Sequence, residues 1–383
     1  MNRSGLTFDA IQFLGLCNML IPRRKTKRYD IVIVKVDAIG DYIIWRDALI
    51  AYKEKYKGKS VLLICADIVK PLAESELFFS EIITFNRKKI ECDLKYFLSI
   101  QRQLLSISAE IVINPVWQRH RISDFFVKSI SANQKVAMRG AGADNIIRKY
   151  YNHSYTTLID NPNTHSEIIA VEFFTRVYVS DSYHYGYSRL EPTTSYSPVD
   201  GQYAVVAISS SSDYKSWEPD KFAQLIATIP EKYDVVLSGA GSGDWERGER
   251  ILELLRKEKR DVKNLINQTS LKELISLISK ATFVIGNDSS AVHIAAACHV
   301  PSICIAPGAH LGRFIPYPDN LPFKQYSPRV VNHTLDCYGC NYICIRPILL
   351  NYECVRLVSV DDVRNVLNKM LLEIENDGRR QTC

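Results

Sequence analysis

The stretch FVIGNDSSAVHIAAACHVPSICIAP, residues 283–307, decides the fold of the second half of this chain. Two apolar runs flank an alanine-rich segment, which predicts a buried strand, a polar corner, a helix and a second buried strand. Asp288, Ser289 and Ser290 lie at the corner, where the free backbone N–H groups of the helix and its dipole face one point. The corner is therefore expected to bind an anion, with His293 one helical turn further on the same face. An ordinary helix cap followed by a satisfied histidine would give the same pattern.

The alternation of apolar runs and helical stretches extends over most of the chain. Near-continuous apolar runs indicate strands covered on both faces, and the stretches between them are long enough for crossover helices. The expected strands are residues 30–36, 60–66, 80–85, 109–115 and 134–140 in the first half and 203–209, 234–238, 283–286 and 302–305 in the second. The expected helices of the second half are residues 219–228, 244–257, 271–280 and 289–298.

A loop-rich segment with several tyrosines, residues 181–198, interrupts this pattern and reads as a linker. We therefore predict an α/β protein made of two Rossmann-like domains. The domains are expected at residues 29–190 and 200–360, between an N-terminal segment, 1–28, and a C-terminal helix and tail, 361–383.

Length, composition and charge are those of an ordinary globular protein. With 383 residues the chain exceeds one typical hydrophobic core, and 46% hydrophobic against 23% charged residues excludes a largely disordered chain. The formal net charge of +6 suits an acidic substrate or a membrane surface as well as a nucleic acid. Six scattered cysteines, several of them in apolar segments, are typical of a reducing compartment and predict a cytoplasmic protein. They are Cys17, Cys65, Cys92, Cys298, Cys304 and Cys383.

The N-terminal segment couples an apolar stretch, residues 6–21, to a basic run, residues 23–28. The stretch is too short to span a bilayer, and Asp9, Gln12 and Asn18 interrupt it. The charge follows the apolar part, whereas in a signal peptide it precedes it. These features predict an amphipathic helix at the cytoplasmic face of the inner membrane, with a helix packed on its own domain or a frayed end as alternatives.

Ligands of parallel sheets bind at the carboxyl ends of the strands, so the loops after the strands are the candidate sites. After the first strand, Gly40 permits a tight turn and Asp41 begins a helix, where its carboxylate could accept a proton from a substrate hydroxyl or simply cap the helix. After the first strand of the second domain, Ser209 and Ser210 offer hydroxyl groups and Lys215 a positive charge, which suits phosphate oxygens. A serine-rich turn with an exposed lysine is the alternative there.

The loop VVLSGAGSGDWERGERI, residues 235–251, resembles a dinucleotide-binding fingerprint only in part. Gly239 and Gly241 follow a strand and precede a helix, but the third glycine position of G-x-G-x-x-G is Asp244. The pattern disfavours a dinucleotide-dependent oxidoreductase. It still predicts a loop in which Gly239 lets the backbone approach a nucleotide base or ribose.

Three motifs together resemble glycosyltransferase family 9, the bacterial heptosyltransferase family. They are IVKVDAIGDYIIWRDAL at residues 33–49, KSW at 215–217 and NDSSAVHIAAACHVPSICIAPGA at 287–309, in the order of the family. The resemblance covers residues 30–366 and implies a GT-B fold, in which two Rossmann-like domains with parallel sheets face each other across a cleft. It also implies an inverting transfer of a sugar, usually heptose from ADP-heptose, onto a lipopolysaccharide, another envelope glycan or a protein.

The same resemblance assigns roles to residues of this chain. It implies Asp41 as general base, Lys215 as a phosphate-binding lysine, and Asp288, Ser289, Ser290 and His293 as sugar and pyrophosphate contacts. The family commonly has D-T-G-x-x-H where this chain has D-S-S-A-V-H, which keeps a hydroxyl and replaces the flexible glycine. Because the chain contains no D-x-D triplet, the lysine and the helix terminus are expected to stabilise the leaving diphosphate without a cofactor. The expected partners are a nucleotide-sugar donor and a glycolipid or protein acceptor, and no nucleic acid.

Four cysteines lie close together in the C-terminal part, in the spacing C-x2-C-x3-C-x9-C. They are Cys337, Cys340, Cys344 and Cys354. In a reducing compartment this spacing predicts a tetrathiolate site for zinc or iron that holds the irregular loop 337–354. The autotransporter heptosyltransferases, members of the same family, look similar in holding an iron ion with cysteines. Four ligands leave no open position, so the site is expected to be structural, and unliganded or paired thiols are the alternative.

The sequence thus predicts a nucleotide-sugar transferase that acts in envelope or protein glycosylation. A nucleotide-sugar epimerase of the same fold is the nearest rival. A dinucleotide-dependent oxidoreductase is disfavoured by Asp244, and a non-catalytic assembly protein by the presence of Asp41 and Lys215.

Overall fold

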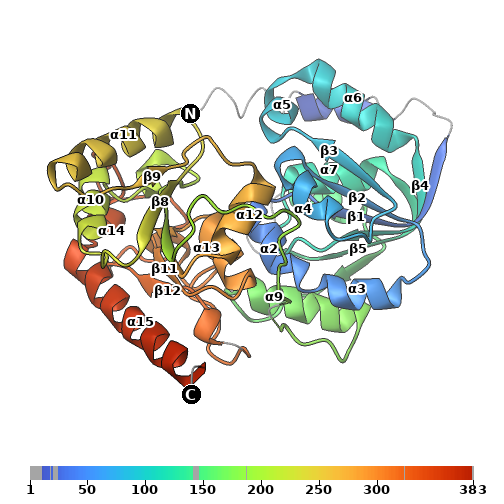
Figure 1. Ribbon diagram of the computed structural model, residues 1–383. Coiled ribbons are helices and arrows are strands. Elements are labelled where there is room, and N and C mark those ends of the chain that lie inside the picture. Colours follow the sequence, from blue (N-terminus) through green and yellow to red (C-terminus); the bar gives the residue numbers. More distant parts are fainter. Residues whose placement is uncertain are drawn as a thin grey trace. The chain divides into compact units, whose positions relative to one another are not determined.

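The computed structural model describes residues 11–17, 19, 25–140, 146–186, 188–322 and 324–381, with side chains as far as residue 376 (Figure 1). The chain divides into two compact units, Met1–His184 and Tyr185–Cys383. Each unit contains one six-stranded sheet, and the strand pairs of both sheets are parallel. The predicted class, an α/β protein with two parallel sheets, is confirmed.

In the first unit the strands lie in the order β3-β2-β1-β4-β5-β6. They are β1 (Lys27–Lys35), β2 (Val61–Ala66), β3 (Glu81–Phe85), β4 (Ile107–Asn114), β5 (Ser131–Met138) and β6 (Thr157–Ile159). The helices are α2 (Ile39–Arg46), α3 (Leu49–Lys55), α4 (Lys70–Glu74), α5 (Arg87–Cys92), α6 (Leu94–Leu105), α7 (Arg121–Ser129), α8 (Ile146–Asn152) and α9 (Glu167–Phe174), with short turns at Asp67–Val69 and Thr175–Val179. Helices cover both faces of the sheet in Figure 1, and β2 is accordingly buried along its whole length.

In the second unit the order is β12-β11-β10-β7-β8-β9. The strands are β7 (Tyr203–Ala207), β8 (Asp234–Ser238), β9 (Lys263–Asn264), β10 (Phe283–Asn287), β11 (Ser302–Ile305) and β12 (Arg329–Val331). The helices are α10 (Pro219–Ala227), α11 (Ser242–Lys257), α12 (Leu271–Ser279), α13 (Ser290–Ala297), α14 (Glu353–Arg356) and α15 (Val360–Gln381), with 3₁₀ turns at Asp213–Lys215, Gly308–His310 and Lys324–Tyr326. Figure 1 shows α10 and α11 on one side of the sheet and α12 and α13 on the other. One apolar core lies between the sheet and α10, α11 and α15.

The sequence missed the outermost strands on one edge of the first sheet and on both edges of the second. These are β6, β9 and β12, none longer than three residues. Strands of two or three residues are too short for an apolar run or an alternation to stand out, so periodicity does not reveal them, whereas the longer edge strand β3 was predicted. The first strand also starts three residues before the predicted position, at Lys27.

This earlier start changes the interpretation of the basic run. Lys27 lies 2.6 Å from Glu81 across the sheet, and Arg28 pairs with Glu110. The end of the run is therefore part of β1 with carboxylate partners. Of the apolar stretch predicted to form an amphipathic helix, residues 6–21, the structure describes residues 11–17 and 19. Residues 11–17 are helical, with Ile11 and Gln12 buried, and the remainder of the stretch lies outside the described residues.

Both sheets have a topological switch point, where the chain stops adding strands on one side of the first strand and starts adding them on its other side. In the first unit the chain proceeds from β1 through β2 to β3 and then returns to β4 beside β1. In the second it proceeds from β7 through β8 to β9 and returns to β10 beside β7. The loops after these four central strands diverge, and the crevice that this leaves is where such sheets bind ligands.

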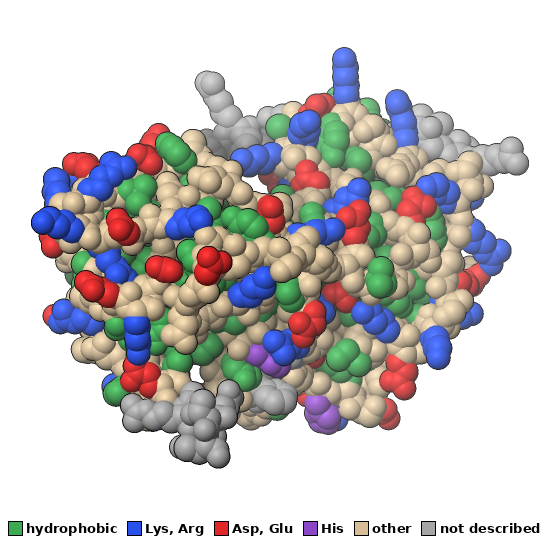
Figure 2. Space-filling view, in the orientation of Figure 1, with side chains coloured by type: hydrophobic (Ala, Val, Ile, Leu, Met, Phe, Trp, Pro, Cys, Tyr) green, Lys and Arg blue, Asp and Glu red, His purple; other side chains and the backbone are tan. Residues whose placement is uncertain are grey.

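On the face that Figure 2 shows, the described side chains form no large patch of purely positive or purely negative charge. Lys and Arg side chains alternate there with Asp and Glu on both units. Within the described parts of the chain, none of the helices combines the length and the apolar character that a membrane span requires.

Candidate functional sites

The buried side-chain amide of Asn287 joins two loops at the switch point of the second unit. Asn287, at the end of β10, is fully buried; its Nδ2 donates to the carbonyl of Ile208 at 2.7 Å, and its Oδ1 accepts from the backbone N–H of Trp217 at 3.0 Å. The indole of Trp217 is also buried and donates to the carbonyl of Val358 at 3.0 Å. The start and the end of the serine-rich loop after β7 are thereby held beside the corner after β10.

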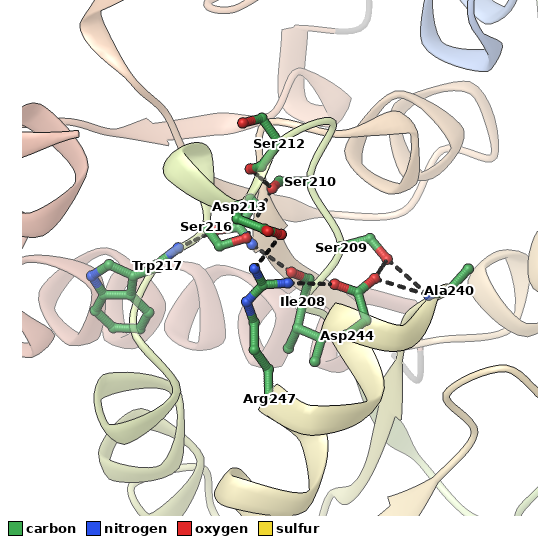
Figure 3. A network of polar contacts seen from close by, with 12 residues as sticks. Ile208, Ser209, Ser210, Ser212, Asp213, Ser216, Trp217, Ala240, Asp244 and Arg247 are labelled. Atoms are coloured by element: carbon green, nitrogen blue, oxygen red, sulfur yellow. Dashed lines mark hydrogen bonds and ion pairs between the residues drawn. The ribbon is translucent and has the colours of Figure 1, made fainter. Parts of the chain in front are cut away.

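Within that loop the two predicted donor-binding serines bond to the protein itself (Figure 3). The Ser209 hydroxyl donates to the carboxylate of Asp244. The Ser210 Oγ lies 2.8 Å from the Ser216 Oγ and also donates to the carbonyl of Ser212. Both hydroxyls therefore contribute to the shape of the loop, and their contact with a phosphate stays a prediction.

The glycine-rich loop after β8 is closed by side chains in the same way. The Asp244 carboxylate accepts from the backbone N–H of Ala240 at 2.9 Å and from Arg247 Nη1 at 3.0 Å (Figure 3). The N–H of Gly241 donates to Asn267 Oδ1 at 2.6 Å. Because α11 begins at Ser242, a carboxylate already occupies the place where a dinucleotide fingerprint receives its pyrophosphate.

Gly239 has a packing reason to be glycine that involves no ligand. A Cβ at this position would lie 3.1 Å from the Cβ of Asp244 and 3.3 Å from Cγ1 of Ile208. These are tighter than ordinary van der Waals contacts, so a larger residue would displace Asp244. The approach of a nucleotide to Gly239 stays a prediction.

Lys215 is the basic group of the site. Its side chain is half-buried at the end of the 3₁₀ turn after β7, and its ammonium lies 3.8 Å from the ring centroid of Tyr342. Burial lowers the pKa of Lys215 from its ordinary value, and the negative charge of Asp288 partly offsets this. Among the described residues no carboxylate lies within salt-bridge distance of its ammonium.

The beginning of α13 provides the second anion-binding feature. Ser289 is the N-cap residue, but its side chain makes no capping hydrogen bond, and among the described residues its buried Oγ has no hydrogen-bond partner. A buried hydroxyl without a partner is costly, and at a helix N-terminus it points to a ligand that would complete it. Asp288 and Ser290 flank it and are partly exposed.

His293 lies deeper than the sequence suggested. It is 4% exposed, its Nδ1 is 2.7 Å from the Tyr317 hydroxyl, and the two rings stack with centroids 5.8 Å apart. Burial lowers its pKa to about 4, so the imidazole is neutral at pH 7. A neutral ring can bind a sugar hydroxyl, but it cannot offset the charge of a phosphate.

The burial of His293 predicts a pH dependence of stability. The folded pKa of about 4 lies below the unfolded value of about 6.5, so the stabilisation is complete above pH 6.5 and is lost as the pH falls towards 4. Between pH 7 and pH 5 this loss amounts to about 2 kcal/mol. His293→Gln, which keeps a polar group but does not titrate, should reduce the difference between denaturant midpoints at the two pH values. The exposed His165, replaced in the same way, serves as control; an equal effect of both changes would contradict the assignment.

In the first unit, Asp41 lies in the first turn of α2 and caps it. Its carboxylate accepts from the backbone N–H of Ala38 at 3.3 Å. The charge of Asp41 also acts on the fully buried ammonium of Lys35, together with Asp37 and Glu167. The cap expected as the alternative is thus present, and the nearby cation favours the ionised carboxylate that a general base needs.

Asp37 and His120 belong to the same cluster and were not singled out in the sequence. Asp37 lies 2.6 Å from Lys35 Nζ and 3.6 Å from His120 Nε2. Burial alone would raise the pKa of Asp37, but Lys35 and His120 outweigh it and hold the pKa well below its usual range. These groups follow β1 and β4, the two strands at the switch point, which only the strand order reveals.

The four clustered cysteines converge on one cavity. Cys337, Cys340, Cys344 and Cys354 line a cavity of about 10 Å³, close to the room that one water-sized atom requires. The Cys354 thiol accepts from the backbone N–H of Gly308 at 3.4 Å. Burial raises the pKa of Cys354, and the other three thiols add to this. In the described part of the chain, however, no three His, Cys, Asp or Glu side chains are placed as ligands of one metal ion.

The chain matches the model of glycosyltransferase family 9 (heptosyltransferase) over residues 97–322, more than half of its length. It belongs to this family, which confirms the resemblance read from the motifs. A curated relative, lipooligosaccharide heptosyltransferase 2 of Campylobacter jejuni, is 27% identical over 134 residues. That alignment covers 34% of this chain and only 40% of the relative.

Two solved structures show that the fold is that of the family. A family 9 glycosyltransferase from Veillonella parvula aligns with a TM-score of 0.68 and 17% identity over 92% of this chain and 99% of its own. The iron-containing, dodecameric heptosyltransferase TibC of enterotoxigenic E. coli, solved with ADP-D-beta-D-heptose, aligns with a TM-score of 0.53 and 16% identity. That alignment covers 91% of this chain and 78% of TibC.

Proposed function

We propose that the protein is an inverting glycosyltransferase that moves a sugar from a nucleotide donor, ADP-heptose, to a lipopolysaccharide, another envelope glycan or a protein. One observation carries the proposal: Lys215 and the N-terminus of α13 flank the switch point of the second unit, and the Ser289 hydroxyl there has no partner among the described residues. A half-buried ammonium and free helix N–H groups suit a diphosphate.

Charge development explains how these groups would act. When the bond between the anomeric carbon and the diphosphate oxygen breaks, negative charge develops on the leaving group. Lys215 and the α13 terminus would stabilise it because they are positioned before the reaction. Lys215 is partly desolvated, which strengthens its interaction with an anion.

Asp41 is the proposed general base. It would take the proton of the acceptor hydroxyl while the oxygen attacks the anomeric carbon from the side opposite the diphosphate, which inverts the configuration. The Lys35 ammonium interacts electrostatically with Asp37, Asp41 and Glu167, and its positive charge favours the ionised form of the base.

The relatives support this choice of donor and acceptor. TibC was solved with ADP-D-beta-D-heptose, and the curated relative from Campylobacter jejuni is a lipooligosaccharide heptosyltransferase. We therefore favour ADP-heptose and an envelope glycolipid, with the protein acting at the cytoplasmic face of the inner membrane. An epimerase would leave no glycosylated acceptor, so mass analysis of the product distinguishes the two reactions.

Replacing the proposed base tests the reaction. Asp41→Asn keeps the size of the side chain and should leave donor affinity nearly unchanged, while turnover falls by about a hundredfold or more. Sugar transfer from ADP-heptose to an acceptor extract is measured together with calorimetric ADP binding. Turnover within about threefold of the parent would remove Asp41 from the mechanism.

Donor binding depends on Lys215 in this proposal. Lys215→Ala should weaken ADP binding by about tenfold or more, because a charge-assisted contact to phosphate is lost. His293→Ala should weaken it less, because its neutral ring meets no phosphate charge. Lys257→Ala, at the opposite end of α11, is the matched control for removal of one positive charge. Unchanged ADP affinity in the Lys215 variant would refute the assignment.

We also propose that the four cysteines hold a structural zinc or iron ion. Four cysteines that line one small cavity are a donor set that zinc and iron both accept, although the described side chains are not placed as ligands of one ion. A bound ion would supply folding energy that the loop lacks, since its apolar side chains are exposed rather than packed. These are Ile343, Ile345, Ile348, Leu349 and Leu350. TibC is described as iron-containing, which supports a metal in this family.

Metal analysis tests the cysteine site. Protein purified without chelator should contain about one zinc or iron per chain, and Cys340→Ser should lose the metal and lower the thermal midpoint. Cys92→Ser, an exposed thiol of the first unit, controls for the loss of a cysteine. Less than about a tenth of an equivalent of metal, with all four thiols titratable in the folded protein, would favour free thiols.

A further inference from the structure

The four-cysteine loop, residues 337–354, is fastened to both segments that border the donor site. On one side it bonds to the segment after β11: the N–H groups of Gly339 and Asn341 donate to the carbonyls of Gly308 and Ala309 at 3.0 and 3.2 Å. On the other side it bonds to the segment after β7: the Tyr352 N–H and the Asn351 Nδ2 donate to the carbonyls of Tyr214 and Ser216 at 2.8 and 3.1 Å. The loop is therefore bonded to the residues on either side of Lys215, Tyr214 and Ser216.

Tyr342 lies between these attachments with its ring under the lysine. The ammonium of Lys215 is 3.8 Å from the ring centroid, and the edge of the His310 ring packs on the same tyrosine at 4.6 Å. The Tyr342 hydroxyl is buried and, among the described residues, has no hydrogen-bond partner. Its position is therefore set by the contacts of the ring and not by the hydroxyl.

The backbone conformation indicates that the surrounding contacts hold Tyr342 in this position. Asn341 and Tyr342 have φ angles of 51° and 61°, in the left-handed region that residues other than glycine adopt at a cost. Such conformations persist where the surroundings determine them. Here the determining contacts are the Asn341 bonds to Ala309 and to His310 and the packing of Tyr342 on Lys215.

We propose that Tyr342 is a positioning residue of the donor site, which holds the Lys215 ammonium in place for the diphosphate, and that the four-cysteine loop serves to present it. This inference rests on the proposed function. A lysine ammonium on a four-carbon stem samples many rotamers, and Asp288 is near enough to attract it. An aromatic face attracts the cation without neutralising it, so the ammonium is ordered and still available to a phosphate.

Calorimetry with ADP and with adenosine tests the role of the ring. Tyr342→Leu should weaken ADP binding by about three- to thirtyfold, the range of a partly desolvated cation–π contact, and leave adenosine binding within about twofold. Tyr342→Phe should match the parent, because it keeps the ring and removes a hydroxyl that has no partner in the described part of the chain. Tyr214→Leu, which removes the ring next to Lys215 in sequence, is the matched control. Equal losses for ADP and adenosine would mean that the ring contacts the base and would overturn the proposal.

A double-mutant cycle separates positioning from a general effect on folding. In a Lys215→Ala background, Tyr342→Leu should cost less than about twofold in ADP affinity, because the cation it orders is gone. The full loss in that background would overturn the proposal. Metal content is measured for each variant, and Tyr342→Met replaces the leucine variant if that protein does not fold.

Nuclear magnetic resonance reports the contact in the unmodified protein. With lysine labelled at the ε carbon, the ε-methylene signal that disappears in Lys215→Arg should be shifted upfield and should lose that shift in Tyr342→Leu. The second variant separates this signal from those of the other lysines near tyrosine rings, Lys55, Lys89, Lys128 and Lys232. The absence of such a signal would overturn the proposal whatever the variants do. If the parent binds neither ADP nor an ADP-sugar, the proposed function fails, whereas the shifted signal would still establish the contact between Lys215 and Tyr342.

Discussion

The proposed donor site depends on the amide of Asn287. This side chain is completely buried and joins the end of β10 to both ends of the loop that follows β7. Removing it would leave a buried carbonyl and a buried N–H without partners, at a cost of about 1–3 kcal/mol each. This bridge links the lysine segment directly to the α13 corner, although the two belong to loops that diverge at the switch point.

The helices α11 and α13 begin along the same edge of this sheet, and they differ in whether a side chain already occupies the N-terminus. At α11 the carboxylate of Asp244 accepts from the loop backbone and is itself paired with Arg247. At α13 the cap residue Ser289 leaves its hydroxyl without a partner among the described residues. An N-terminus already filled by a carboxylate has little attraction for another anion, whereas an open one retains it. We therefore propose the α13 terminus, and not the α11 terminus, as the one that binds the diphosphate.

The first unit contains a lysine, Lys35, whose side chain is fully buried. An isolated ammonium in such a place would be expensive, so carboxylates must surround Lys35. Asp37 makes the close contact at 2.6 Å, while Asp41 and Glu167 contribute charge. The candidate base is thus one of several anions that share a single buried cation, which makes its ionised state part of the stability of the unit.

The sequence alone determined the local features of this protein. Apolar runs predicted the central parallel strands, and the D-S-S corner predicted the start of α13. The spacing of four cysteines predicted a metal site; the structure places all four at one cavity, and the metal stays a prediction. The tertiary structure decided what each side chain meets: Ser209 bonds to Asp244, His293 to Tyr317, and Lys215 rests on Tyr342. The reason is that periodicity and caps act over a few neighbouring residues. Contacts between strand ends depend on the order of the strands and on distant loops, which no local pattern encodes.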